Sequence, residues 1–510
     1  MEIPLTLIDY LKRAELVYGD QIAVVDEPDQ PANPLSELTY KELGQSARSL
    51  AAGLDALGIE LGARIAIVSQ NSARMLIFLF GTSAFGRVGV PINFRLNKEE
   101  ISYIVEHSGA EVLLIDPELK EDLADINVKH FFVLGEESDH LFENTNTPKP
   151  WTPDENATAT INYTSGTTAR PKGVEMTHRN LWLNAAIFGW QTGVDHREIY
   201  LHTLPMFHCN GWGMPYAITG MGGRHIVLRK VDGLEILKRI AEHDVTLLCG
   251  APAVIASILE AATDWDGEIP GSGKMRIVVA GAPPPTKTIE RVETELGWEF
   301  IQIYGLTETA PFVTMNRIRP EWDDKTAQER AALLSSAGSP ALGIDLSTSP
   351  DGELLVRGNH VLKSYWKQAE ATDEALANGW FHTGDGATLG KDQYVTITDR
   401  KKDVIISGGE NISSIEVEDV LFSHPSVAEV AVIGVPDEKW GETVKALVVL
   451  VESESTDEKT LISYCRENLA HYKCPTSIDF LEELARTTTG KLQKFKLREP
   501  YWKDMNRQIN

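Results

Sequence analysis

The most informative stretch of the sequence is Ile161-Asn162-Tyr163-Thr164-Ser165-Gly166-Thr167-Thr168-Ala169-Arg170-Pro171-Lys172-Gly173-Val174. The pattern predicts a strand that ends in a loop rich in hydroxyl groups. Hydroxyl and backbone N–H groups donate to phosphate oxygens, glycine lets the backbone approach, and lysine supplies positive charge. The Gly-Lys-Ser/Thr order of a Walker A loop is missing, so we predict a phosphate-binding loop of another kind, with a polar surface turn as the alternative. Its phosphate contacts are expected from Thr164, Ser165, Gly166, Thr167, Thr168 and Lys172.

Outward from this loop, the chain alternates helical and strand patterns. Thr39 and Glu42 have the spacing of a capping box, and apolar residues follow at helical intervals until Gly58. A second cap signal lies at 97–100, and apolar runs at 65–68 and 111–116 are typical of buried strands. The alternation of strands and helices continues, with expected strands near 226–228, 245–248, 277–280 and 300–304. Strands separated by helices predict parallel, doubly wound sheets covered on both faces, and therefore an α/β fold.

The pattern changes after about residue 350. Segments 354–357 and 394–398 indicate strands of a smaller β-rich layer, and a charged run that we expect to be solvated follows at Asp399–Asp403. A helix near 414–422, strands near 430–435 and 444–451 and a helix near 459–469 come next. We therefore predict a large N-terminal domain over residues 1–400 and a small α+β C-terminal domain over 401–510.

Composition and charge exclude several classes of protein. The chain has 510 residues, of which 42% are hydrophobic and 24% charged, as in ordinary globular proteins. Its formal net charge is −26, which repels nucleic acid and anionic lipid unless a local basic patch exists. We expect no nucleic-acid partner, and an anionic ligand must be held by a specific pocket.

The cysteine content and the lengths of the apolar stretches predict a cytoplasmic protein. No secretory leader is visible at the N-terminus, the final residues are not a peroxisomal address, and the most apolar stretch, Met75–Val90, is shorter than the roughly 20 residues of a membrane span. The four cysteines are too scattered for a disulfide framework or a zinc site: Cys209, Cys249, Cys465 and Cys474.

Four further segments turn the loop into part of a larger pattern. They are Tyr304-Gly305-Leu306-Thr307-Glu308-Thr309, Trp380-Phe381-His382-Thr383-Gly384-Asp385, Asp399-Arg400 with Ile405-Ile406-Ser407-Gly408-Gly409-Glu410-Asn411, and Arg486-Thr487-Thr488-Thr489-Gly490-Lys491. In this order, and over essentially the whole chain, the five motifs resemble the adenylate-forming superfamily of acyl-CoA synthetases, firefly luciferases and peptide-synthetase adenylation domains. The resemblance implies that a carboxylate attacks the α-phosphate of ATP and that the thiol of coenzyme A then displaces AMP. It also implies Mg²⁺, ATP and CoA as the cofactor and co-substrates.

The resemblance assigns roles to individual residues of the nucleotide site. Lys491 matches the C-terminal catalytic lysine, with a solvated tail lysine as the alternative. Glu308 matches the Mg²⁺ ligand, with a hydroxyl from Thr164 or Thr307, although a helix-capping glutamate would have the same spacing. The expected ribose contacts are Asp385 and Arg400, the expected walls of the adenine slot are Gly281, Ala282, Pro283 and Tyr304, and Gly305 is expected beside both nucleotide and acyl group.

The segment Leu204–Trp212 bears on the acid. It holds no aspartate that could pair an ammonium group, so an amino-acid substrate is disfavoured. It resembles the corresponding segment of medium-chain fatty-acyl and related carboxylate–CoA ligases, in which His208 and Trp212 would border the acyl carboxylate and its tunnel. Ordinary core packing of these two side chains is the alternative.

The acceptor side is assigned by resemblance as well. Gly408 and Gly409 would leave room for the pantetheine arm, Lys473 would contact a CoA phosphate, and Lys402 falls at the hinge of a mobile C-terminal domain. A lysine without a partner is an equal alternative for Lys473. An acyl-AMP ligase that loads a carrier protein and a non-catalytic nucleotide-binding relative remain alternative functions, and a homodimer is one of the open oligomeric states.

Overall fold

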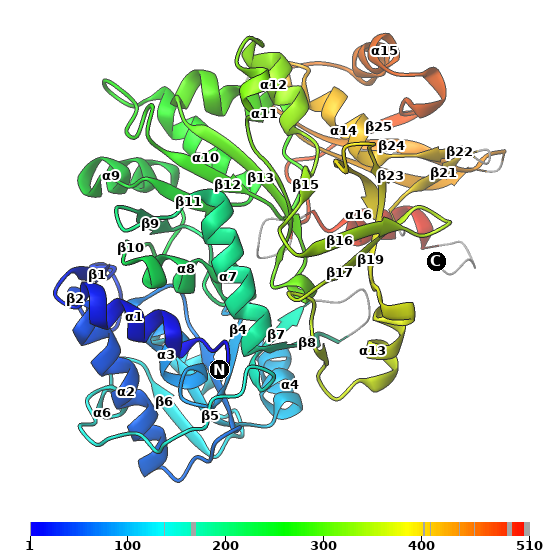
Figure 1. Cartoon of the computed structure of the whole chain (residues 1–510). Helices are drawn as coiled ribbons and strands as arrows, with labels where there is room; N and C mark the ends of the chain where they lie inside the picture. Colours follow the sequence, from blue (N-terminus) through cyan, green and yellow to red (C-terminus); the bar gives the residue numbers. More distant parts are fainter. Residues whose placement is uncertain are drawn as a thin grey trace.

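The computed structural model of the chain has two parts, which run from blue to yellow and from orange to red in Figure 1. It describes residues 2–136, 138–164, 170–400, 403–407, 410–437, 439–452, 454–486 and 492–503, with only the backbone at 400 and 411. Over these residues the strands form four sheets of nine, seven, four and five strands. None of the helices in these ranges is both long and apolar enough to cross a bilayer.

The largest sheet consists, from edge to edge, of β15 (Ser339–Pro340), β14 (Phe312–Asn316), β13 (Glu299–Gly305), β12 (Arg276–Val279), β11 (Leu247–Gly250), β9 (Ile199–His202), β10 (Arg224–Val227), β1 (Ile22–Val25) and β2 (Glu37–Thr39). The strands from β13 to β1 are parallel, and the strands at the two edges are antiparallel. One face packs on α9 (Gly233–His243), α10 (Pro252–Thr263) and α11 (Thr286–Arg291), and the other on α7 (His178–Thr192) and α8 (Met214–Met221). The central strands are therefore buried on both faces, as their apolar runs predict.

The second sheet consists of β18 (Ser364–Tyr365), β8 (Lys172–Thr177), β7 (Thr158–Thr164), β4 (Val88–Ile92), β3 (Arg64–Val68), β5 (Ala110–Ile115) and β6 (His130–Val133). Its strands from β7 to β6 are parallel, whereas β8 and β18 are antiparallel additions. Helices α2 (Tyr40–Ala56) and α3 (Ala73–Ser83) cover one face, and α4 (Lys98–Ser108) covers the other. The capping boxes predicted from Thr39 and Asn97 are both formed.

A four-stranded antiparallel layer follows, made of β16 (Ile344–Thr348), β17 (Glu353–Gly358), β19 (Phe381–Leu389) and β20 (Val395–Arg400). The expectation that the whole charged run is solvated is wrong. Asp399 lies inside β20 and is buried, and its carboxylate accepts a hydrogen bond from the backbone N–H of Ser414 at 2.9 Å. Asp403 pairs with Arg498.

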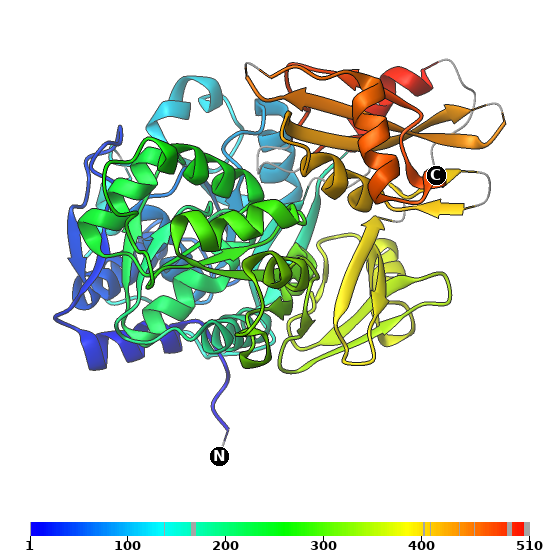
Figure 2. The same cartoon turned by 90° about the horizontal axis from the view of Figure 1, so that it is seen from above.

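The C-terminal part has its own sheet, made of β22 (Glu410–Ile412), β21 (Ile405–Ser407), β24 (Gly441–Leu450) and β23 (Val427–Asp437), with β25 (Ser477–Phe480) parallel to β24. Helices α14 (Ser414–Phe422) and α15 (Glu458–Asn468) pack on one face and α16 (Lys494–Trp502) on the other. Figures 1 and 2 show this part next to the four-stranded layer. The predicted fold class is therefore confirmed: α/β with parallel sheets, a small β layer and a C-terminal α+β part.

Candidate active site

The adenine-slot candidates lie together at one edge of the largest sheet. Parallel strands β12 and β13 are in register, with Val279 opposite Gln302, so the segments that follow them leave the sheet side by side. Gly281–Pro283 follows β12, and Gly305 ends β13. Gly281 has φ +97°, a conformation that favours glycine. The carboxyl ends of parallel strands are the usual place for a ligand in such sheets.

Tyr304 and Asp385 contact each other directly. The phenolic O–H of Tyr304 donates to Oδ2 of Asp385 at 2.7 Å, although the residues lie on β13 and β19 of different sheets. Asp385 is only 7% exposed, and the backbone of Arg400 lies opposite it on β20. The structure therefore brings the predicted aromatic wall and the predicted ribose acid into one place.

Gly305 stands where no larger residue fits. A Cβ built on it would lie 1.5 Å from the carbonyl oxygen of Pro311. The short helical turn η4 (Thr307–Thr309) follows immediately, and its side-chain cap comes from Thr309. Close backbone approach at Gly305 thus fixes the direction in which Thr307 and Glu308 leave the sheet.

Glu308 is bound to a residue that the sequence did not single out. The O–H of Tyr365, on β18, donates to Oε1 of Glu308 at 2.9 Å, and the backbone oxygen of Glu308 accepts from Leu362 at 2.7 Å. Burial, and then the neighbouring charge of Glu308, raise the pKa of Tyr365 above its usual value. Nζ of Lys172 lies 4.9 Å from the centroid of the Tyr365 ring.

The hydroxyl-rich loop joins two neighbouring antiparallel strands. Thr164, the last residue of β7, lies opposite Lys172, the first residue of β8. The other predicted phosphate contacts lie outside the described residues: Ser165, Gly166, Thr167 and Thr168. Thr164 and Lys172 are therefore the two ends of the loop that can be placed, and Lys172 lies against the ring of Tyr365, whose strand β18 pairs with β8.

The acyl-side candidates lie in a left-handed turn. The consecutive residues Cys209, Asn210, Gly211, Trp212 and Gly213 all have φ between +48° and +82°, and all are buried. For residues other than glycine this conformation costs roughly 1–2 kcal/mol each, so the surroundings must stabilise it. His208 directly precedes the turn and is half-buried, while Trp212 is 4% exposed.

Three asparagines hold this turn in place, and sequence reasoning missed all three. Asn210 donates to Oγ1 of Thr160 at 3.0 Å and to Oδ1 of Asn162 at 3.1 Å. Asn184 donates to the backbone oxygen of Trp212 at 3.1 Å. These residues come from β7, α7 and the turn itself, so no local pattern in the sequence links them.

A side-chain contact joins the turn to the nucleotide side. Sγ of Cys209 lies 3.1 Å from Oγ1 of Thr307, next to Glu308. The acyl-side and nucleotide-side candidates therefore meet at Thr307.

Four C-terminal candidates, Lys402, Gly408, Gly409 and Lys491, lie outside the described residues, and Arg400 is described by its backbone alone. Lys473 is not the partnerless lysine of the alternative reading, because its Nζ lies 2.7 Å from both carboxylate oxygens of Glu416, which raises its pKa. Asp419 on α14 accepts hydrogen bonds from the backbone and side chain of Thr286, at 2.8 and 3.0 Å.

The donor set suits a magnesium ion that is held mainly by phosphate oxygens. Within the described residues no group of three His, Cys, Asp or Glu side chains could hold a metal by itself. Glu308 supplies one half-buried carboxylate, Thr307 directly precedes it, and Thr164 at the end of β7 is the other hydroxyl candidate. Mg²⁺ commonly takes one or two carboxylates together with substrate phosphates, so the residues fit such an ion.

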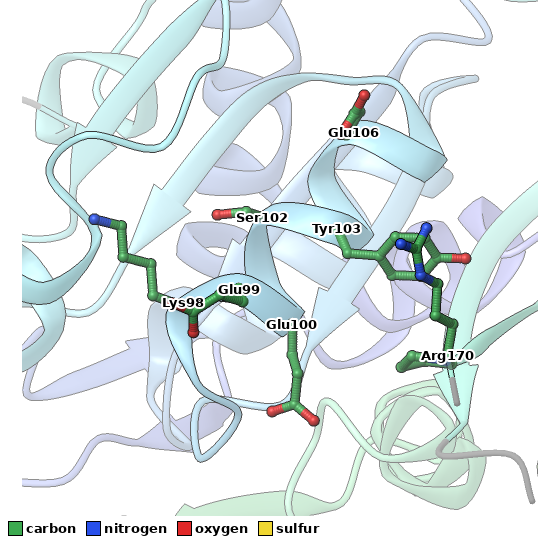
Figure 3. A pocket seen from close by; sticks show the side chains of 8 residues that line it. Lys98, Glu99, Glu100, Ser102, Tyr103, Glu106 and Arg170 are labelled. Atoms are coloured by element: carbon green, nitrogen blue, oxygen red, sulfur yellow. The ribbon is translucent and has the colours of Figure 1, made fainter. Parts of the chain in front are cut away.

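A cavity of about 500 Å³ opens beside the loop, at the start of β8. Figure 3 shows Arg170 across the ring of Tyr103, and the guanidinium carbon lies 5.1 Å from the ring centroid. Glu99, Glu100 and Glu106 also line it. Three carboxylates beside one arginine and one lysine, Lys98, do not favour an anionic ligand there.

Comparison with protein families gives two matches. The model of the AMP-binding enzyme family matches residues 11–366, and the model of the AMP-binding enzyme C-terminal domain matches residues 416–491.

Individual relatives match over nearly the whole chain. A 2-methylpropanoate–CoA ligase of Humulus lupulus is 36% identical, over 97% of this chain and 95% of its own length. A peroxisomal benzoate–CoA ligase of Arabidopsis thaliana is 34% identical, over 98% and 93%. The solved structure of o-succinylbenzoate CoA synthetase from Bacillus subtilis, in complex with its acyl-adenylate intermediate, is 29% identical, with a TM-score of 0.83 over 98% of this chain and 99% of that one.

Proposed function

Since the chain belongs to the AMP-binding enzyme family and is an AMP-forming acid–CoA ligase, we propose that it activates a monocarboxylic acid with a compact apolar acyl group. The expected membership of the adenylate-forming superfamily is confirmed. The narrower expectation of a medium-chain fatty acid has less support, since the relatives are named for 2-methylpropanoate and benzoate.

The reaction proceeds in two balanced steps. A carboxylate oxygen of the acid bonds to the α-phosphorus of ATP, the bond to the bridging oxygen breaks, and pyrophosphate leaves. The sulfur of the CoA thiol then bonds to the acyl carbon of the acyl-adenylate and loses its proton to water, the acyl C–O bond of the mixed anhydride breaks, and AMP leaves with the electron pair of that bond. Both steps join reactants that carry like charges, so the chain acts mainly by positioning them and by offsetting negative charge.

The nucleotide side of the proposed site is the pair Tyr304 and Asp385. The carboxylate of Asp385, held by the O–H of Tyr304 at 2.7 Å, accepts hydrogen bonds from the ribose hydroxyls. Gly281, Ala282 and Pro283 flank the adenine, and Gly305 lets the backbone pass close to it.

The charge on the phosphates is offset by Lys172, Lys491 and a magnesium site at Glu308. Bound there, Mg²⁺ would neutralise phosphate charge, with Glu308 and a hydroxyl of Thr164 or Thr307 as its protein ligands. Lys172 at the loop end supplies a second fixed positive charge.

The acyl side is formed by His208 and the left-handed turn. Trp212 and Met214, two residues further along, are buried, and Phe207 packs edge-on against Phe94 with ring centroids 5.7 Å apart. These packed apolar walls favour a compact acyl group, and the stretch from Leu204 to Trp212 offers no carboxylate for an ammonium group.

The C-terminal part is proposed to serve both steps by turning about Lys402. In one orientation Lys491 faces the α-phosphate, and in the other Gly408 and Gly409 make room for pantetheine while Lys473 contacts a CoA phosphate. Because Lys473 already pairs with Glu416, a CoA phosphate would have to compete with that carboxylate.

The observation that carries this proposal is the meeting of the Tyr304–Asp385 pair, Glu308 and the Cys209–Gly213 turn around Thr307. The test is a pyrophosphate-release screen over short, branched, medium-chain, long and aryl acids, with CoA, with a carrier protein, and with neither. We expect release with short, branched or aryl acids and consumption of free CoA. Consumption of the carrier alone would favour the carrier-loading alternative, and no release with any acid would favour a non-catalytic relative.

A further inference from the structure

We propose that Tyr365 is a positioning residue, which holds the carboxylate of Glu308 in the orientation used for metal–nucleotide binding. The inference rests on the proposed function, because it assumes that Glu308 binds the metal. It adds a residue that lies outside all five motifs from which the site was predicted.

The contact between the two residues is buried and direct. The O–H of Tyr365 donates to Oε1 of Glu308 at 2.9 Å, and Tyr365 is 8% exposed. A tyrosine O–H keeps its proton at neutral pH, so it stays a donor. Among the described residues, Oε2 of Glu308 accepts no hydrogen bond, which leaves it available to a ligand.

The backbone around Tyr365 is fixed on both sides. Strand β18 pairs with β8, where Tyr365 lies opposite Val174. The N–H of Tyr365 donates to Oγ1 of Thr372 at 2.9 Å, and the next N–H, of Trp366, donates to the oxygen of Gly173 at 2.7 Å. The ring therefore cannot follow Glu308 if the carboxylate turns away.

The same ring also contacts the end of the hydroxyl-rich loop. Nζ of Lys172 lies 4.9 Å from its centroid, within the range of a cation–π interaction. Tyr365 thus contacts a cationic and an anionic candidate through different parts of one side chain, the ring face for Lys172 and the O–H for Glu308.

The test measures binding of Mn²⁺, as a spectroscopically visible substitute for Mg²⁺, to the full chain with ATP and without any acid. Partners that orient a ligating carboxylate typically contribute 10–100-fold to metal affinity, so we expect Tyr365→Phe to weaken Mn²⁺ binding by about that factor. The matched control is Tyr10→Phe, which removes another O–H bond, to the oxygen of Trp182 at 2.6 Å, away from the site. Equal Mn²⁺ affinity in the two variants would overturn the proposal.

Two further variants distinguish the contribution of the Tyr365 O–H to binding from the contribution of its aromatic ring. In a Glu308→Ala background, Tyr365→Phe should cause no additional loss of Mn²⁺ affinity, because the O–H then has no carboxylate to orient. Tyr365→Leu should lose Mn²⁺ affinity at least as strongly as Tyr365→Phe and, unlike Tyr365→Phe, should also weaken ATP binding measured in EDTA, since Lys172 loses the ring. A full additional loss in the Glu308→Ala background would contradict the positioning role.

Failure of this inference can be told apart from failure of the proposed function. If the unsubstituted chain binds Mn²⁺ with ATP and releases pyrophosphate with an acid, the proposed function stands, and only the variants decide the role of Tyr365. If the unsubstituted chain does neither, the proposed function fails and this inference fails with it.

Discussion

The nucleotide side and the acyl side of the site are stabilised by different means. On the nucleotide side, residues with ordinary backbone conformations on strands or in the turn after β13 are bonded to one another, as in the Tyr304–Asp385 and Tyr365–Glu308 pairs. On the acyl side, five consecutive buried residues adopt positive φ angles, and asparagine side chains hold them there.

This difference predicts different consequences of substitution. The register of the sheets sets the backbone of the nucleotide side, so a side chain can be changed there without loss of the fold. The left-handed turn costs roughly 1–2 kcal/mol for each residue other than glycine, and each hydrogen bond that offsets this contributes about 1 kcal/mol. Changes on the nucleotide side should therefore affect every acid alike, whereas changes in the turn should alter stability and acid choice together.

The largest effect is expected from Glu308→Ala. Loss of the one carboxylate at the proposed metal position should lower the rate of acid-dependent pyrophosphate release by about 10²–10³-fold. The loss should be the same for an aliphatic and an aryl acid, and the melting temperature should change little. A loss confined to one class of acid would show that Glu308 belongs to the acyl side, contrary to the comparison.

Asn210→Ala should mainly reduce stability. It leaves a buried residue at φ +51° and removes hydrogen bonds to Thr160 and Asn162, so we expect the free energy of unfolding to fall by about 2–4 kcal/mol in denaturant titrations. Asn210→Gly is the matched control, because glycine accepts this φ but makes no side-chain bonds. If alanine and glycine were equally stable, the strain assigned to the turn would be wrong.

Tyr304→Phe should weaken ATP binding about tenfold. The variant removes the O–H that holds Asp385 at 2.7 Å and leaves the aromatic wall in place. The KM for ATP should rise while the ranking of acids stays unchanged, and steady-state kinetics with two acids measures both. A changed ranking of acids would contradict the claim that changes on the nucleotide side affect every acid alike.

The smallest effect is expected at the contact between the sides. Cys209→Ala and Thr307→Val each remove one partner of the 3.1 Å contact, and neither substitution introduces glycine or proline. A double-mutant cycle on kcat/KM should give a coupling of about 0.5–1.5 kcal/mol. Fully additive losses would mean that the two sides do not communicate through this contact.

The fold was largely predictable because its signals are local. Apolar runs such as Ile277–Val279 mark the buried parallel strands, and the capping boxes at Thr39 and Asn97 mark helix starts. The adenine-slot candidates, which the resemblance assigns as a group, lie together because strands β12 and β13 run in register and the candidates lie at or just after the strand ends.

The remaining features depend on contacts between distant segments. Strand β18 has two residues and no periodicity, so nothing local indicates that Tyr365 reaches Glu308. Gly211 and Gly213 suggest an unusual backbone, but the turn that contains Cys209 and Trp212 is held by hydrogen bonds with Thr160, Asn162 and Asn184, which lie far away in the chain. The buried Asp399 was misjudged for the same reason, since its partner Ser414 is the first residue of α14, in the C-terminal part.

The most direct test of the central claim is the exchange of labelled pyrophosphate into ATP in the absence of CoA. Formation of an acyl-adenylate before the thioester predicts exchange that requires both Mg²⁺ and an acid, and a single addition of CoA should then yield equal amounts of AMP and acyl-CoA. Exchange without any acid, or products of ADP and phosphate, would contradict the account.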